Sequence, residues 1–187
     1  MTDTNTLHKV LGDILSKYQA SFSKKVYEEE DNESGPLMEI FGITPELKRE
    51  NRQYWGRELG MCWQRLIVRL CMETCKEFGP ALHFGADEPC DLIVGNLAID
   101  TKYRIGSGDS GTLKKFKAYA PLLRNEGYEP VLLIVRLDNL PAAITACKAG
   151  GWNLYTGDST FDYVKKLTGF DIMAYLATKA SEYKVRP

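Results

Sequence analysis

The segment from Glu129 to Leu137 constrains the fold of this chain most strongly. It is the most apolar part of the sequence and is rich in Val, Leu and Ile. Its uninterrupted apolar run, residues 131–135, is far shorter than the roughly 20 residues that a membrane-spanning helix needs. A short aliphatic run of this kind is typical of a strand buried inside a sheet. We therefore predict a central buried strand here.

Helical and strand patterns alternate around this segment. Apolar spacing predicts a helix over 5–26, then a short helix that begins at about residue 44 and a longer one that ends at about residue 78. Further helices are predicted over 112–125, 140–149, 158–168 and 170–184. It predicts further strands over 81–84 and 152–155, and a hairpin over 91–103. Strands that alternate with helices after a helical start indicate an α/β fold with a mixed central β-sheet flanked by helices.

The length of 187 residues indicates a single domain, 1–187. We divide it into a helical N-terminal region with an acidic loop, 1–50, and a core, 51–187. The sequence begins polar and shows no secretory signal, so we expect a soluble, cytoplasmic protein that does not contact a membrane.

Cysteine and histidine usage agrees with that expectation. The five cysteines form no C-x-x-C pair and only two histidines occur, so four ligands at zinc-binding spacing are not available. We predict buried free thiols in a reducing compartment.

The charges of the chain balance but are unevenly placed. With 24 basic and 25 acidic residues the formal net charge is −1, which excludes a globally basic nucleic-acid-binding protein. Five acids fall within residues 28–33, and five bases against one acid within residues 102–117. The basic stretch is typical of a phosphate-binding surface and equally of a solvated helix face.

The predicted hairpin brings charged side chains together. A two-residue turn at Gly95-Asn96 places Asp91 opposite Asp100, with Lys102 on the same face as Asp100. Opposed carboxylates about 5 Å apart repel each other and destabilise a sheet unless a cation lies between them. Mg²⁺ prefers such oxygen ligands, so we favour a metal site. The alternative is a surface Asp–Lys ion pair worth less than about 1 kcal/mol.

These residues carry a resemblance. Pro89-Cys90-Asp91 followed by Asp100-Thr101-Lys102 resembles the signature of the PD-(D/E)xK nucleases, and the surrounding sequence resembles type II restriction endonucleases. The resemblance implies a restriction-endonuclease-like fold in which Asp91, Asp100 and the carbonyl of Thr101 bind Mg²⁺ while Lys102 acts on the attacking water. It also implies a catalytic role for Glu58 on the preceding helix, although Glu58 fits an ordinary helix-surface charge equally well.

One residue departs from the family pattern. Cys90 separates the proline from the aspartate, which leaves Glu88 as an alternative first ligand. The hairpin register favours Asp91, because Glu88 lies beyond the paired segment.

The family resemblance also implies a reaction and partners. We expect a Mg²⁺-dependent hydrolase, a sequence-specific endonuclease that cuts double-stranded DNA at a short palindromic site. It would act as a homodimer in a restriction system, with a DNA methyltransferase in the same cell. A structure-specific or nicking nuclease of the same fold and a DNA-binding module that does not cleave remain alternatives.

A glycine-rich loop follows the hairpin. Gly106, Gly108 and Gly111 match a dinucleotide-binding pattern, but the preceding strand is charged and the predicted helix starts only after the third glycine. We therefore predict that the loop and the next helix contact DNA. The candidate DNA-binding residues are Arg104, for which guanine is a suitable partner, and Ser107, Asp109, Ser110, Lys114, Lys115 and Lys117.

Overall fold

The computed structural model of the chain describes residues 3–23, 52–106 and 108–179. Its centre is a five-stranded sheet in the order β1 (Phe78–Pro80), β2 (Leu92–Val94), β3 (Leu97–Lys102), β4 (Glu129–Ile134) and β5 (Asn153–Thr156). The first three strands pair antiparallel and the last three pair parallel. The predicted mixed sheet is therefore confirmed.

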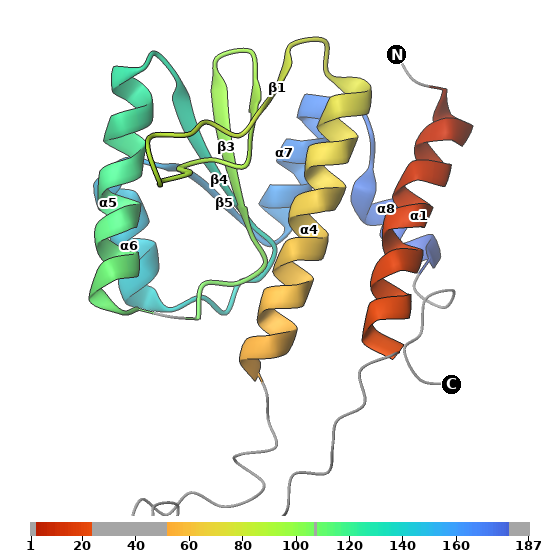
Figure 1. Cartoon of the computed structure of the whole chain (residues 1–187), viewed down its shortest axis with the longest axis horizontal. Coiled ribbons are helices and arrows are strands. Elements are labelled where there is room, and N and C mark those ends of the chain that lie inside the picture. Colours follow the sequence, from red (N-terminus) through yellow and green to blue (C-terminus); the bar gives the residue numbers. More distant parts are fainter. Residues whose placement is uncertain (1–2, 24–51, 107, 180–187) are drawn as a thin grey trace, which may run out of the picture.

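Helices cover both faces of the sheet (Figure 1). Helices α5 (Ser110–Asn125) and α6 (Pro141–Gly150) lie on one face, and α4 (Arg52–Thr74) and α7 (Asp158–Thr168) lie on the other. Helices α1 (Thr4–Ser23) and α8 (Ile172–Lys179) form a further layer outside α4 and α7. The α/β class is confirmed, and none of the described helices is long and apolar enough to cross a membrane.

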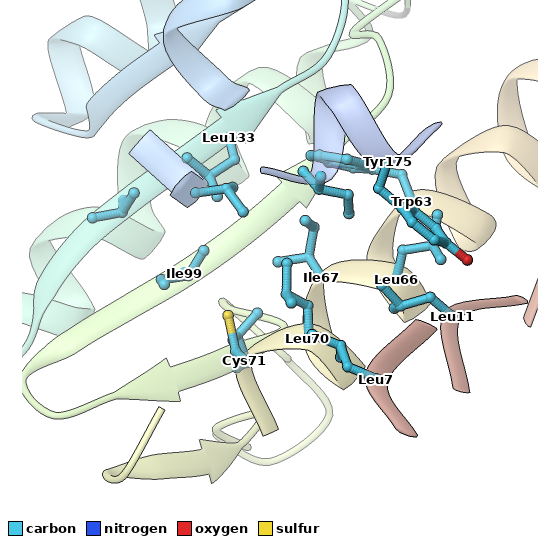
Figure 2. Close-up of a cluster of buried hydrophobic side chains, with 14 residues drawn as sticks. Leu7, Leu11, Trp63, Leu66, Ile67, Leu70, Cys71, Ile99, Leu133 and Tyr175 are labelled. Carbon is cyan, nitrogen blue, oxygen red and sulfur yellow. The ribbon is translucent and has the colours of Figure 1, made fainter. Parts of the chain in front are cut away.

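Two hydrophobic cores lie on the two faces of β4. Val131 and Leu133 pack into the core beneath α4, where Figure 2 shows Leu133 and Ile99 facing the side chains of α4 and α1. Leu132 and Ile134 pack into the core beneath α5 and α6. All four side chains are at most 1% exposed. A strand buried on both faces reads as a continuous apolar run, which is why the sequence predicted this strand.

The hairpin register is as predicted for its paired residues. Leu92 pairs with Ile99, Ile93 with Ala98 and Val94 with Leu97. Gly95 has a φ of +58°, the positive value that the first position of a type II′ turn requires.

The region before the hairpin differs from the prediction. Helix α4 ends at Thr74 instead of about residue 78, and the edge strand β1 covers 78–80 instead of 81–84. Phe78 ends the helical pattern because it packs into the core beneath α4 as part of a strand. Pro80 is tolerated in β1 because an edge strand leaves one side unpaired. The short helix predicted near residue 44 and the acidic run fall outside the described residues.

The helix after the glycine-rich loop also begins earlier than predicted. Helix α5 starts at Ser110, before the third glycine, because the side chain of Asp109 caps it. Helix α6 ends at Gly150, and the following Gly151 caps it in the left-handed conformation with a φ of +87°.

Candidate functional site

The parallel strands end at one edge of the sheet, where α4 begins and α5 and α6 start (lower part of Figure 1). Lys102 is the last residue of β3, with Asp100 and Thr101 directly before it. Asp91 directly precedes β2. Because β2 and β3 are paired, this short segment of the hairpin gathers four of the five residues of the predicted catalytic and metal site, all except Glu58.

Asp91 is held by hydrogen bonds, although not as a ladder partner of Asp100. Strand pairing begins at Leu92, and the Asp91 amide donates to the carbonyl of Ile99 (2.8 Å). Oδ2 of Asp91 accepts from the amide (2.7 Å) and the hydroxyl (2.6 Å) of Thr101. The prediction that Asp91 and Asp100 are paired opposite each other in the ladder is therefore wrong, because regular pairing stops at Leu92. The extra hydrogen bonds of Asp91 replace regular pairing, as at a bulge.

Asp100 and Lys102 form an ion pair in this segment. The Lys102 ammonium lies 2.6 Å from Oδ1 of Asp100 and also donates to the Thr101 carbonyl (3.2 Å). Burial raises the pKa of Asp100 to about 6, against the opposing effect of Lys102. The negative charge of Asp91 raises this pKa further. The negative charges of the two aspartates therefore destabilise each other.

The same negative charges change the pKa of Lys102. Burial alone would lower the pKa of Lys102, but Asp100 and Asp91 together raise it above its ordinary value. The ammonium therefore stays charged at neutral pH.

Gln64 joins the site from α4, which the sequence analysis did not predict. Its Nε2 donates to Oδ1 of Asp91 (2.7 Å). The sequence contains a pattern that places Gln64 on the buried side of α4, because Gln64 precedes Ile67 by three residues and Cys71 by seven, which is helical spacing. Those two residues are fully buried and face the sheet. A polar residue in helical register with a buried stripe is placed to meet a buried polar partner.

The other two acidic candidates lie away from this group. Glu58 pairs with Arg57 (3.2 Å), and its charge acts on Tyr18 of α1. It is six residues before Gln64, about 120° away around the helix. Glu88 is exposed in the loop before β2. Among the candidates for the first ligand, Asp91 is the one that reaches Asp100.

The candidate DNA-binding residues differ in their partners and exposure. Asp109 caps α5 by accepting from the amide (2.9 Å) and the hydroxyl (2.6 Å) of Thr112, so this helix start is already occupied by a carboxylate. Lys115 pairs with Asp87 (3.2 Å). Lys114 and Lys117 are exposed on α5, as is Ser110 at its first position. Ser107 lies outside the described residues.

Arg104 is the candidate that lies nearest to the motif along the chain. It follows Lys102 by two residues and forms an ion pair with Asp138 (3.1 Å) in the loop after β4. That loop was not singled out from the sequence.

The donor pattern leaves carboxylate oxygens with free lone pairs. Oδ2 of Asp91 accepts two hydrogen bonds, whereas Oδ1 accepts one, from Gln64. Oδ1 of Asp100 accepts from Lys102, and no amine, amide or hydroxyl of the described residues donates to its Oδ2. Two carboxylates with free lone pairs fit a hard divalent cation that completes its shell with water or phosphate. Within the described ranges no three His, Cys, Asp or Glu side chains gather as a metal-binding group.

Comparison of the chain with protein-family models, with curated proteins and with solved structures finds no match.

Proposed function

We propose that this protein is a Mg²⁺-dependent, sequence-specific endonuclease that cuts double-stranded DNA, of the type II restriction class. The observation that carries the proposal is the grouping of Asp91, Asp100 and Lys102 at the carboxyl edge of the sheet, where Asp91 accepts from Thr101 and Lys102 pairs with Asp100. A buried carboxylate beside a second carboxylate is unfavourable at neutral pH unless a proton or a metal ion neutralises part of the charge. A structural ion pair needs only Asp100 and Lys102 and does not require a second carboxylate beside it.

The position of the motif supports a restriction-endonuclease-like fold. In the PD-(D/E)xK nucleases that the motif resembles, the acidic residues and the lysine sit on a β-hairpin. Here the corresponding residues lie on the hairpin of β2 and β3. The hairpin continues into a sheet with helices on both faces.

Each residue of the site has a chemical role in this proposal. The free carboxylate oxygens of Asp91 and Asp100, with the Thr101 carbonyl, would hold the Mg²⁺. When bound, that ion supplies Lewis acidity at the scissile phosphate and lowers the pKa of a water molecule. Lys102 orients the attacking water and stabilises the charge that develops on the phosphate. Gln64 and the Thr101 hydroxyl are positioning residues, since they fix the carboxylate of Asp91.

Two partners follow from the proposed reaction. One site of this kind cuts one strand, so symmetric cleavage of a palindrome needs two copies related by a two-fold axis. The proposed enzyme is therefore a homodimer. A methyltransferase that modifies the same sequence would protect the DNA of the host.

The test is digestion of plasmid DNA by the purified protein. We expect discrete fragments in the presence of Mg²⁺ and none with EDTA. Lys102→Ala should abolish cleavage. Lys166→Ala, which removes an exposed lysine of α7, should leave cleavage unchanged. Circular dichroism of both variants shows whether they remain folded.

Other outcomes point to the alternatives. Nicked circles without linear fragments would indicate a nicking enzyme of the same fold. Intact plasmid with Mg²⁺-independent DNA binding would indicate a binding module and would overturn the proposed catalysis.

A further inference from the structure

A second cluster of charged side chains lies two residues beyond Lys102, about 7 Å further along an extended chain. Nε of Arg104 donates to the carbonyl of Asp138 (2.8 Å) and lies 3.1 Å from its Oδ2. Nε of Arg136 donates to Oδ1 of the same carboxylate (2.8 Å). One carboxylate thus holds two guanidinium groups. The three side chains are 45%, 50% and 53% exposed, in the order Arg104, Arg136 and Asp138.

The backbone beneath this cluster is firmly held. The amide of Arg136 donates to the carbonyl of Tyr103 (3.0 Å), which continues the pairing of β3 with β4. Asn139 joins the two segments, because its Oδ1 accepts from the Ile105 amide (2.8 Å) and its Nδ2 donates to the Arg136 carbonyl (2.6 Å). Segments 103–105 and 136–140 therefore lie side by side as one surface next to the motif. Recognition residues need this kind of fixed support.

Folding stability does not explain the cluster. Exposed ion pairs contribute about 0–1 kcal/mol. Leu137, between Arg136 and Asp138, is 76% exposed, the highest value among the exposed large hydrophobic side chains of the described residues. It lies over Gly157 at the end of β5, where a Cβ atom would come within 2.7 Å of its Cδ2. Arginine is enriched among the residues that dominate binding at contact surfaces, and Leu137 adds an exposed apolar group between the two arginines.

We propose that Arg104, Arg136 and Asp138 recognise a G·C base pair in the major groove and that Leu137 contacts the methyl group of a neighbouring thymine. This inference rests on the proposed DNA cleavage and assigns specificity to the loop after β4. Arginine donates two hydrogen bonds to O6 and N7 of guanine, and a carboxylate accepts from N4 of cytosine. Because Asp138 engages Arg104 through Nε, the terminal amino groups of Arg104 remain as donors toward a base. Asp138 also engages Arg136 through Nε, and the Arg136 guanidinium interacts in addition with the side chain of Tyr103.

The carboxylate of Asp138 favours a base over a phosphate as the ligand of this cluster. Asp138 carries a full negative charge at neutral pH, since Arg136 holds its pKa below the usual value. It is half exposed and lies beside both arginines. Asp138 weakens a phosphate contact of the two arginines, whereas the edge of a base pair is uncharged and offers cytosine N4 as a donor to this carboxylate.

The experiment uses the full chain and begins with the cleavage site of the wild-type protein. Arg104→Lys and Arg136→Lys keep the charge and lose the planar fork. We expect each to lower cleavage of the cognate site roughly 10- to 100-fold and to relax discrimination at one G·C pair. Replacing that guanine with 7-deazaguanine should slow the wild-type protein about tenfold and slow the lysine variant no further. Arg124→Lys makes the same change at the far end of α5 and should cleave as the wild type does.

Leu137→Ala provides a second test that folding cannot confound, because its side chain is exposed. It should relax discrimination at a T·A pair next to the recognised G·C pair.

Equal activity of the wild type and the lysine variants on every site would overturn the inference and leave the proposed nuclease standing. A uniform loss on all sequences, without an effect of 7-deazaguanine, would indicate a phosphate contact and also overturn it. Absence of any cleavage by the wild type would overturn both proposals.

Discussion

The ammonium of Lys102 lies 2.6 Å from a carboxylate oxygen of Asp100, and both side chains come from alternate positions of the same strand. Despite this ion pair, the pKa of Asp100 is raised to about 6, because burial and the neighbouring Asp91 outweigh the lysine. The ion pair therefore compensates only part of the negative charge. The remainder gives the site its affinity for a further cation in our proposal.

The first prediction concerns removal of that charge. Asp100→Asn mimics the protonated carboxyl, so we expect it to stabilise the metal-free protein at about pH 8 by at most about 3 kcal/mol, the value of a shift of about two pKa units. Cleavage should fall at least about 100-fold, as expected for loss of a group that acts in the reaction. Binding to DNA should be retained or tightened, since a negative charge near phosphate is removed. Chemical denaturation and gel-shift titration measure the two effects.

Asp162→Asn is the matched control for this variant. It makes the same change at an exposed position of α7 and should alter neither stability nor cleavage. Loss of DNA binding by Asp100→Asn, with the fold intact, would contradict the catalytic role and favour a binding module.

The second prediction concerns pH. An acid whose pKa is raised on folding binds more protons in the native state than in the unfolded state. The contribution of Asp100 to stability is therefore greatest below about pH 4 and is lost as the pH rises through about 6. Metal binding needs the carboxylate, so divalent affinity should increase over the same range. Thermal unfolding with and without Mn²⁺ should show little stabilisation at about pH 5 and the full effect above about pH 7.

Asp100→Asn tests the assignment of this pH dependence. In this variant the stability of the metal-free protein should no longer fall as the pH rises through 6. Stabilisation by Mn²⁺ should no longer increase over the same pH range. An unchanged pH profile in the variant would show that another group titrates.

The third prediction concerns the two thiols at the end of α4. Cys71 and Cys75 are four residues apart, and their hydrogen bond lowers the pKa of Cys75 to about 6 while it raises that of Cys71. Cys75 is also partly exposed, whereas Cys71 is buried. We expect iodoacetamide to alkylate Cys75 first at neutral pH, with a rate that increases through about pH 6. Mass spectrometry of the modified protein gives the order of reaction.

Burial raises the pKa of Cys62 to about 11, so this partly exposed cysteine is an internal comparison. In Cys71→Ala the midpoint of Cys75 alkylation should move upward. Equal alkylation rates for Cys62 and Cys75 in the wild type would contradict the assigned hydrogen bond.

The hairpin and the central strand could be predicted because their signals are local. The turn at Gly95 fixes the register of residues 92–99, and the apolar run fixes burial of β4 on both faces. Asp91 departs from the predicted pairing because the side chains of Thr101 and Gln64 accommodate its carboxylate. Gln64 lies 27 residues before Asp91 in sequence, and a contact of that kind depends on how α4 packs on the sheet.

The surface near Arg104 also depends on a contact between residues far apart in the sequence. Arg104 was a candidate on its own, as an arginine after the motif. Its partner Asp138 lies 34 residues further on, and the two meet because β3 and β4 pair in parallel across the intervening helix α5. No spacing rule in a single sequence connects those positions.

The last prediction adds a third carboxylate to the site. Gln64→Glu changes the group that donates to Asp91 into one that repels it. We expect the metal-free protein to lose about 1–3 kcal/mol, the usual effect of an unpaired charge in a partly buried site. Stabilisation by Mn²⁺ should be larger than in the wild type, because a further oxygen ligand becomes available. Thermal unfolding across a Mn²⁺ titration measures both effects.

Two further variants complete this test. Gln19→Glu makes the same change on α1, in the layer outside α4, and should leave the response to Mn²⁺ unaltered. Gln64→Ala removes the hydrogen bond without adding charge, so it should weaken the response to Mn²⁺ and slow cleavage about tenfold through a less ordered Asp91. If Gln64→Glu lowered stability without strengthening the response to Mn²⁺, the three residues would not share a cation, and the proposed metal site at Asp91 and Asp100 would be wrong.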